Sequence, residues 1–247
     1  MAHVMGSAQR SDDPARSRQR VARALGVLVA VDAAILVVAL LLGYLVVGRH
    51  GGGIIQGWDD TVGRWYLQHR WGLVGVSKVV AVLGDALGLA VISVVLTVVF
   101  LFTMRSIRAL VPIVAYLGAE FVVFVTREFI KRHRPPTAVY PAPGAIRGVH
   151  ETSYSFPSGH AMAATAVLFG LLGTLALTRR TWWPWVLALV ASLFVIDTRL
   201  VLGVHWFSDV TFGIVLGATW GAVVALVAQT LEWSDVTTAL RRQSDPG

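Results

Sequence analysis

The chain has 247 residues, of which 55% are hydrophobic and only 14% are charged, whereas about 25% of the residues in a soluble globular domain are charged. This composition excludes an ordinary soluble domain, and the absence of cysteine excludes disulfide bonds and thiolate metal sites. The net charge of +7 does not indicate a nucleic-acid partner, because the basic residues lie in short segments beside apolar stretches, as membrane-flanking residues do.

Six apolar stretches are long enough to cross a membrane, since about 20 helical residues span its hydrocarbon core. They cover residues 24–47, 79–102, 108–130, 158–178, 183–203 and 208–231. The sequence therefore predicts an all-α, polytopic membrane protein whose six transmembrane helices form one bundle. Residues 1–23 are expected to be a disordered cytoplasmic tail, residues 24–231 the membrane domain, and residues 232–247 a C-terminal cytoplasmic tail.

The distribution of Lys and Arg predicts the orientation of the bundle. With the N-terminus in the cytoplasm, 11 of the 21 basic residues would lie inside and 10 outside. The arginine-rich N-terminal flank usually dominates orientation, and several of the outer residues belong to the candidate site below. We therefore expect both termini in the cytoplasm. The strong preference for Arg over Lys suggests a GC-rich bacterial genome, and hence a bacterial plasma membrane.

Between the first two stretches, residues 54–77 carry Trp58, Val62, Trp65 and Tyr66 at helical spacing, with polar residues largely on another face. This pattern is typical of an amphipathic helix that lies in the membrane interface. Such a helix can serve as an aromatic anchor or as a lid over a site, and the sequence leaves both roles open.

Arg199, His205 and Asp209 follow one another from the end of the fifth stretch into the sixth. The four-residue spacing of His205 and Asp209 predicts that they share one face of a helix. An aspartate that accepts the Nδ1–H of an imidazole leaves Nε2 free as a nucleophile. Such a pair alone is more often a surface pair. Arg199 favours the catalytic interpretation, because its guanidinium matches the oxygens of a phosphate.

Ser158, Gly159 and His160 follow Pro157 and lead directly into the fourth apolar stretch. The free N–H groups and the positive dipole of a helix N-terminus bind anions, and glycine lets the backbone approach them closely. His160 could protonate a departing oxygen as a general acid. The alternative is a serine that only caps the helix.

Arg127 and Arg134 stand on either side of the end of the third stretch, with Lys131 and Arg132 between them. A basic flank whose side chains extend to the membrane surface needs no further function, and we assign Lys131 and Arg132 to such a flank. Arg134, directly before Pro135, is assigned to a phosphate.

Together, these segments resemble the type-2 phosphatidic acid phosphatase superfamily, whose signatures are K-x6-R-P, P-S-G-H and S-R-x5-H-x3-D. The resemblance covers roughly residues 54–231, and the six stretches match its membrane branch, which includes bacterial phosphatidylglycerophosphate and undecaprenyl-diphosphate phosphatases. It implies that His205 is the nucleophile, Asp209 its orienting partner and His160 the general acid. It also implies that the phosphate is bound by Arg127, Arg134, Ser158, Gly159 and Arg199.

Two positions depart from the pattern of that superfamily. Arg127 stands where lysine is usual and Thr198 where serine is usual. Arginine keeps the charge but replaces a point donor with a planar fork, so we expect an altered phosphate geometry. The resemblance implies that no metal and no cofactor takes part, which agrees with the lack of an acidic cluster that could supply oxygen ligands to magnesium.

The sequence thus predicts a lipid phosphatase, a phosphoric monoester or diphosphate hydrolase that acts from the extracytoplasmic face through a phosphohistidine. Polyprenyl diphosphate, a cell wall precursor carrier, is the first choice of substrate; phosphatidylglycerophosphate, phosphatidate and a prenyl-linked sugar phosphate stay open. The main alternative is a carrier or flippase that binds a lipid phosphate without cleaving it. A degenerate regulatory protein is disfavoured by the intact His160, His205 and Asp209, and a haloperoxidase by the membrane spans. No obligate protein partner is evident.

Overall fold

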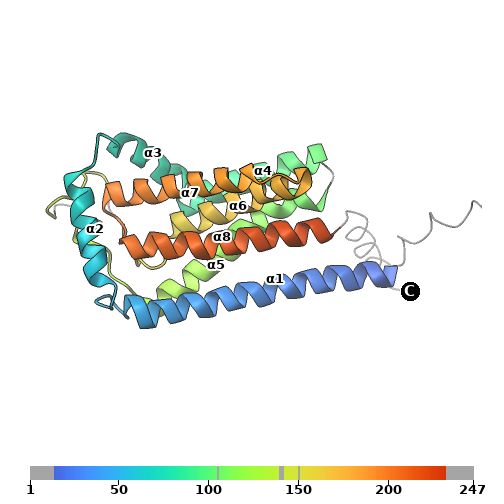
Figure 1. Cartoon of the computed structure of the whole chain (residues 1–247), viewed down its shortest axis with the longest axis horizontal. Helices are drawn as coiled ribbons and strands as arrows, with labels where there is room; N and C mark the ends of the chain where they lie inside the picture. The colour runs from blue at the N-terminus through green and yellow to red at the C-terminus, as the bar shows by residue number, and fades with distance from the viewer. Residues whose placement is uncertain (1–13, 105, 139–141, 150, 232–247) are drawn as a thin grey trace, which may run out of the picture.

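The computed structural model describes residues 14–104, 106–138, 142–149 and 151–231, and every regular element in these ranges is a helix. Six of the described helices are long and apolar enough to cross a membrane, so the prediction of a six-span, all-α membrane protein is confirmed. They lie side by side in one bundle (Figure 1). These helices are α1 (Pro14–Leu42), α4 (Ala86–Met104), α5 (Val111–Ile130), α6 (Gly159–Arg179), α7 (Trp183–Leu202) and α8 (Phe207–Thr230).

Five shorter helices and turns complete the described fold. A π-helical turn, η1 (Gly43–Val47), extends α1, and a 3-10 turn, η2 (Ile107–Leu110), precedes α5. A further 3-10 turn, η3 (Pro136–Ala138), follows α5. The helices α2 (Gln56–Gln68) and α3 (Val74–Leu83) lie between the first two spans, and both are found at the same end of the bundle (Figure 1).

The first helix begins earlier than the sequence predicts. It starts at Pro14, so the prediction that residues 14–23 are disordered is wrong. Alanine and arginine are good helix formers, and extending an existing helix avoids the cost of nucleating a new one. Residues 1–13 and the predicted tail 232–247 lie outside the described residues.

The second predicted span, residues 79–102, begins too early, because its first residues belong to the separate helix α3. The chain breaks at Gly84 and Asp85 before α4 starts at Ala86. The Asp85 carboxylate accepts the backbone N–H of Gly88 at 2.5 Å, which is how an acidic residue caps a helix start. An apolar run alone did not reveal this boundary.

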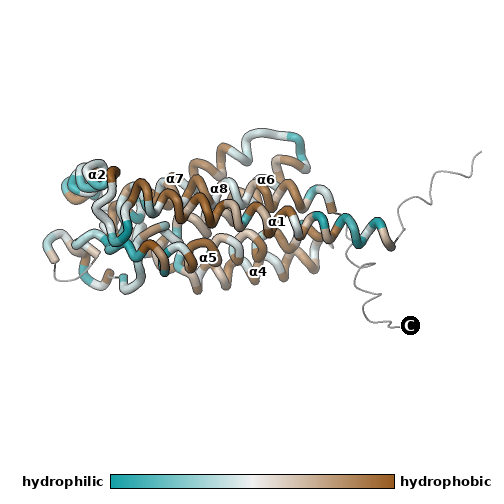
Figure 2. The backbone as a smooth tube through the Cα atoms, turned by 90° about the horizontal axis from the view of Figure 1, so that it is seen from below, coloured by the Kyte–Doolittle hydropathy of each residue, from teal (hydrophilic) through white to brown (hydrophobic). Residues whose placement is uncertain are grey.

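The helices α6 and α8 form the most tightly packed pair of the bundle. A Cβ atom on Gly217 would lie 2.3 Å from the carbonyl oxygen of Met162, and one on Gly221 equally close to that of Ala166. Small residues let membrane helices approach to backbone contact, where packing and polar interactions replace the hydrophobic effect. In contrast, α1 and α4 expose most of their apolar side chains. Figure 2 shows hydrophobic colour along the long helices and hydrophilic colour near α2.

The helix α2 lies across one end of the bundle, roughly at right angles to the long helices (Figure 1). Val62 and Tyr66 pack against a cluster of α6, α7 and α8 side chains, whereas Trp58 and Trp65 are exposed. The predicted amphipathic helix therefore exists, although it ends at Gln68 and not near residue 77.

Candidate active site

The structure brings the predicted site residues to the end of the bundle that α2 covers. This end gathers the last turns of α5 and α7 and the first turns of α6 and α8. The last turns carry Arg127 and Arg199, the first turns carry Gly159, His160 and Asp209, and the N-cap of α6 is Ser158. Arg134 and His205 lie in the segments that connect these helices.

His205 lies in a turn and not on a helix, so the prediction that it shares a helix face with Asp209 is wrong. Gly203 ends α7 with a φ of +70°, a conformation that residues with a Cβ atom rarely adopt. The chain reverses there, and α8 begins after Trp206. The turn nevertheless brings His205 Nδ1 to 3.5 Å from Asp209 Oδ2, while the backbone N–H of Trp206 holds the same oxygen at 2.9 Å.

The hydrogen bonds around His205 define its tautomer. Arg134 Nη1 lies 2.9 Å from His205 Nε2. A guanidinium can only donate, so Nε2 must be the acceptor and the proton resides on Nδ1, which faces Asp209. The Ser155 hydroxyl donates to Asp209 Oδ2 and lies 3.4 Å from Nδ1. The imidazole is therefore held with its Nε2 lone pair directed toward the arginines.

Arg134 and Arg199 share a single carboxylate, that of Glu151. Arg199 Nη2 lies 3.0 Å from Glu151 Oε1, and Arg134 Nη2 lies 3.4 Å from Oε2. The Nε and Nη1 donors of Arg199 are buried and have no partner among the described residues. Buried donors without partners are costly, and a bound anion would satisfy them.

Arg127 lies over the start of α6. Its Nε donates to the carbonyl of Pro157 at 3.3 Å, and its Nη2 would stand 3.2 Å from a Cβ atom on Gly159. The absence of a side chain at Gly159 thus leaves room for the guanidinium. Arg127, Arg134 and Arg199 together form a cluster of cations around His205, which we call the arginine cluster.

The arginine cluster and burial both change the protonation of His205. Burial lowers the pKa of His205 well below 6.5, and the charges of Arg134, Arg199 and Arg127 lower it further. The imidazole is therefore neutral at physiological pH. Burial also lowers the pKa of Arg134 to about 10, against the opposing effect of Glu151, so Arg134 stays charged.

The first turn of α6 offers backbone donors to the same region. Ser158 caps the helix by accepting the N–H of Ala161 at 3.4 Å, and its own N–H donates to the Asp209 carbonyl at 3.1 Å. The amides of Gly159 and His160 begin the helix, and the first amides of a helix have no acceptor within it. What Ser158 can still offer an anion is its hydroxyl proton.

His160 is oriented by α3. Its Nε2 lies 2.8 Å from the carbonyl oxygen of Ala81. A carbonyl accepts only, so this nitrogen carries a proton, and Nδ1 remains for proton transfer. A Cβ atom on Gly84 would lie 3.0 Å from the His160 ring, so the chain after α3 also packs against it.

Arg132 is the main residue that the sequence misassigned. Its side chain is fully buried, so its assignment to a membrane flank is wrong. It bonds Asp209 Oδ1 at 2.6 Å and Asp59 Oδ2 at 2.5 Å. One feature of the sequence could have indicated that Arg132 belongs to the site. Residues two apart in an extended chain point to the same side, and Arg132 precedes Arg134 by two in the extended segment after α5. Neither Asp59 nor Glu151 had such a signal.

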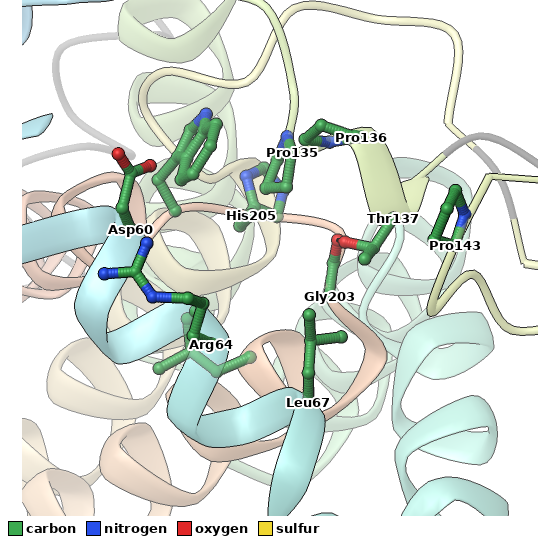
Figure 3. A pocket seen from close by; sticks show the side chains of 12 residues that line it. Asp60, Arg64, Leu67, Pro135, Pro136, Thr137, Pro143, Gly203 and His205 are labelled. Atoms are coloured by element: carbon green, nitrogen blue, oxygen red, sulfur yellow. Dashed lines mark hydrogen bonds between the residues drawn. The ribbon is translucent and has the colours of Figure 1, made fainter.

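Two pockets flank the site. One, of about 280 Å³, touches His205 and lies between α2 and the segment after α5. Figure 3 shows Asp60 and Arg64 of α2 on one side of this pocket and Pro143 on the other. The second, of about 440 Å³, runs along α5 and includes Arg127 and the exposed Phe124.

Comparison with known proteins assigns the chain to a family. The PAP2 superfamily matches residues 108–233, and the chain belongs to this superfamily. The resemblance drawn from the three sequence motifs is thereby confirmed. The matched region contains α5 to α8, which carry the arginine cluster, His160, His205 and Asp209.

Several relatives are named for an activity. The decaprenylphosphoryl-5-phosphoribose phosphatase of Mycobacterium tuberculosis is 35% identical over 106 residues, which cover 43% of this chain and 53% of that protein. Phosphatidylglycerophosphatase B of Bacillus subtilis is 37% identical over 98 residues, covering 38% and 44%. An undecaprenyl-diphosphatase of Sulfolobus acidocaldarius is 37% identical over 67 residues, covering 27% and 30%. The match thus spans about half the length of the first of these relatives, and less of the others.

A solved structure shares the fold over more of the chain. It is the crystal structure of a transmembrane PAP2-type phosphatidylglycerolphosphate phosphatase from Bacillus subtilis. The TM-score is 0.62 at 26% identity, and the alignment covers 79% of this chain and 93% of that one.

Proposed function

We propose that this protein is an integral-membrane phosphatase that removes a phosphate from a lipid phosphate or diphosphate through a phosphohistidine on His205. One observation carries the proposal: Arg134 of the arginine cluster donates to Nε2 of a neutral imidazole whose Nδ1–H faces Asp209, and the charges of Arg199 and Arg127 act on the same ring. An imidazole in this state is a nucleophile, and guanidinium groups around it match the oxygens of a phosphate.

In the first step, the Nε2 lone pair of His205 attacks phosphorus, and the bond between phosphorus and the lipid oxygen breaks. The arginine cluster and the first amides of α6 stabilise charge on the phosphoryl oxygens. In this step His160 acts as an imidazolium with a proton on each nitrogen, a form that the bound phosphate anion favours; Nδ1 gives its proton to the departing oxygen, while Nε2–H stays on the carbonyl of Ala81. Asp209 stabilises the positive charge that the ring acquires when Nε2 is phosphorylated.

In the second step, water attacks phosphorus, and the bond between phosphorus and Nε2 breaks. His160, now without its Nδ1 proton, accepts a proton from this water. The products are inorganic phosphate and the starting form of His205. Every proton is exchanged among water, His160 and the lipid oxygen, so the two steps need no further reactant.

We infer that the phosphate binds where the Glu151 carboxylate now lies. Its carboxylate bridges Arg134 and Arg199, so one acidic side chain fills part of the space in which the phosphoryl oxygens would lie. We infer that the substrate displaces Glu151, because two anions in the same position would repel each other. Glu151 is about a quarter exposed (26%), and it belongs to a connecting segment, which makes this exchange possible.

The pocket along α5 suits a lipid. It joins Arg127 of the arginine cluster to Phe124, which is 68% exposed on the surface of a span. A headgroup in this pocket would reach Arg127 while its chains remained beside α5. We favour a polyprenyl-linked phosphate, since two of the relatives are named for decaprenyl and undecaprenyl substrates. Phosphatidylglycerophosphate is the next choice.

We further propose that the site faces the extracytoplasmic side of a bacterial plasma membrane, with both termini in the cytoplasm. The α2 end of the bundle carries the site, and α1 begins at the opposite end (Figure 1). The basic N-terminal turns of α1 would then remain inside.

Phosphate release by the purified protein in detergent tests the proposal. The substrates are a polyprenyl diphosphate, a polyprenyl-linked sugar phosphate, phosphatidylglycerophosphate and phosphatidate, each with and without excess EDTA. No group of three or more His, Asp or Glu side chains within the described ranges is arranged to hold a metal ion, and we expect release to resist EDTA.

Two control variants complete the test. His205→Ala should abolish phosphate release. Lys131→Gln removes a nearby cation at the C-cap of α5, and it should leave phosphate release unchanged. Unchanged release by His205→Ala would refute the mechanism. Binding of a lipid phosphate without release by the wild-type protein would favour a carrier.

A further inference from the structure

The interfacial helix α2 contributes a buried carboxylate to the region behind the nucleophile. The side chain of Asp59 is fully buried, although α2 lies on the surface of the bundle. Its Oδ1 accepts the backbone N–H of Ser208 at 2.8 Å, and its Oδ2 accepts the Ser208 hydroxyl at 2.6 Å. Asp59 thus binds the first turn of α8, one residue before Asp209.

Arg132 connects Asp59 to Asp209. Its Nη2 bonds Asp59 Oδ2 at 2.5 Å, and its Nη1 bonds Asp209 Oδ1 at 2.6 Å. The guanidinium also lies 5.3 Å from the centre of the Trp206 ring. All three charged side chains are fully buried, where charge interactions are stronger than in water. A chain of alternating charges, which we call the Asp59 relay, therefore runs from α2 through Arg132 to Asp209 and His205.

The count of charges in the relay has a consequence for the reaction. Asp59 and Asp209 each carry one negative charge and Arg132 one positive charge, so the relay has one net negative charge. Without Asp59, Arg132 would neutralise Asp209, and no net charge would oppose the positive charge of a phosphorylated imidazole.

We propose that Asp59 is a positioning residue for the nucleophile. Through Arg132 it fixes the Asp209 carboxylate, and it leaves the relay with the net negative charge that stabilises His205 in its cationic, phosphorylated form. This inference rests on the proposed phosphatase function and assigns the helix α2 a role beyond anchoring or covering the site.

The groups around His205 predict the direction in which loss of Asp59 shifts the pKa of the imidazole. The charged and titratable groups that face it come from every neighbouring element: Arg127 on α5, Arg134 and Glu151 in the α5–α6 segment, His160 on α6, Arg199 on α7 and Asp209 on α8. This group is predominantly positive. Loss of the relay's negative charge would disfavour the protonated imidazole further.

The first test is Asp59→Asn, with kcat and kcat/KM measured against pH. We expect kcat to fall about tenfold or more with little change in KM, because the lost stabilisation concerns the phosphorylated ring. The acid limb of kcat/KM should move to lower pH, since the pKa of His205 falls further below its ordinary value. If the substitution only loosened the structure, water would enter, and the acid limb would move to higher pH, toward the ordinary pKa of histidine. An upward or absent shift would overturn the proposal.

Tyr66→Phe is the matched control. The Tyr66 hydroxyl donates to Asp197 Oδ1 at 2.8 Å, which is another polar tether between α2 and the bundle, and it lies outside the relay. The variant should keep the wild-type acid limb and kcat within about twofold. Asp59→Glu, which restores the charge, should recover most of kcat. An equal loss in Tyr66→Phe and Asp59→Asn would show that only docking of α2 matters.

Gln56→Glu carries the test if Asp59→Asn does not fold. Gln56 begins α2 and its Oε1 lies 3.1 Å from Arg132 Nη2. A glutamate is favourable in the first turn of a helix, and its added negative charge should move the acid limb to higher pH. No shift would contradict the relay.

NMR titration of the His205 ring provides a readout that does not need activity. The pKa of His205 should decrease in Asp59→Asn and increase in Gln56→Glu, whichever lipid is the substrate. If the wild-type protein releases no phosphate but these shifts occur, the proposed function fails and the charge coupling stands. If release occurs without these shifts, the relay is wrong and the function stands.

Discussion

His205 owes its reactivity to the residues that surround each of its two nitrogens. Asp209 and Ser155 lie on the Nδ1 side, and Arg134 lies on the Nε2 side. The carboxylate favours a cationic ring, whereas the arginine cluster opposes it. In the free protein, burial and the cations outweigh the carboxylate and lower the pKa of His205. A bound phosphate would neutralise the cations and thereby let Asp209 stabilise the phosphorylated ring.

This balance predicts the pH dependence of the enzyme. The neutral imidazole is the reactive form, so a lowered pKa preserves activity into acid, and the acid limb of kcat/KM should lie below pH 6.5. Arg134→Gln removes one opposing cation, so the pKa of His205 should rise and the limb should move to higher pH. Both proteins receive the same substrate, so its own ionisation cancels in the comparison. A limb that stays in place or falls in Arg134→Gln would contradict the account.

Glu151 provides a second prediction for a single residue. Glu151→Gln removes the anion that bridges Arg134 and Arg199. Inorganic phosphate should then inhibit about two- to fivefold more strongly, since exposed or partly exposed ion pairs contribute up to about 1 kcal/mol. Asp197→Asn is the control, because it neutralises an acid of α7 that bonds Tyr66 and not the arginine cluster. A weaker inhibition by phosphate in Glu151→Gln would show that this carboxylate assists anion binding.

At the level of helices, the geometry of the site depends on how closely α6 and α8 approach. One helix begins with Gly159 and His160, and the other begins beside His205. The glycine at position 217 sets their distance, because a Cβ atom there would meet a backbone carbonyl that has no freedom to turn away.

Gly217→Ala should therefore separate α6 and α8. We expect a cost of roughly 1–3 kcal/mol, as for other overpacked sites, seen as a lower Tm, together with a loss of activity. Gly26→Ala in α1 is the matched control, since a Cβ atom on Gly26 would meet nothing within 4 Å. Thermal unfolding in detergent and phosphate release measure both effects. A Gly217→Ala protein with unchanged Tm and unchanged activity would show that the two helices are not in such close contact.

The helix ends show what the sequence could and could not predict. The length of the apolar stretches and the residues that flank them predict where α5 and α7 end and where α6 and α8 begin. These four helix ends lie at the same end of the bundle, so the sequence also predicts that the site residues meet there. The partner of Arg132 could not be found in this way. Asp59 lies 73 residues away along the chain, and their contact depends on α2 lying across the bundle. Glu151 lies in a segment without periodicity, so no pattern pointed to it.

The whole molecule places its site at one end and its basic N-terminal turns at the other. The orientation in the membrane can be tested because the chain has no cysteine, so single cysteines report their own position. In intact cells, a membrane-impermeant maleimide should label Gln68→Cys at the α2 end. Arg180→Cys, which follows α6 at the opposite end, should be labelled only after permeabilisation. The reverse pattern would place the site in the cytoplasm.

A phosphorylated His205 is the central claim of the proposed mechanism, and rapid-quench trapping with a lipid substrate that carries ³²P in its terminal phosphate tests it most directly. The account predicts a label on the protein that is stable in base, labile in acid and located by mass spectrometry on His205. His205→Ala should carry no label. Rapid phosphate release with no labelled protein, or a label on another residue, would contradict the account.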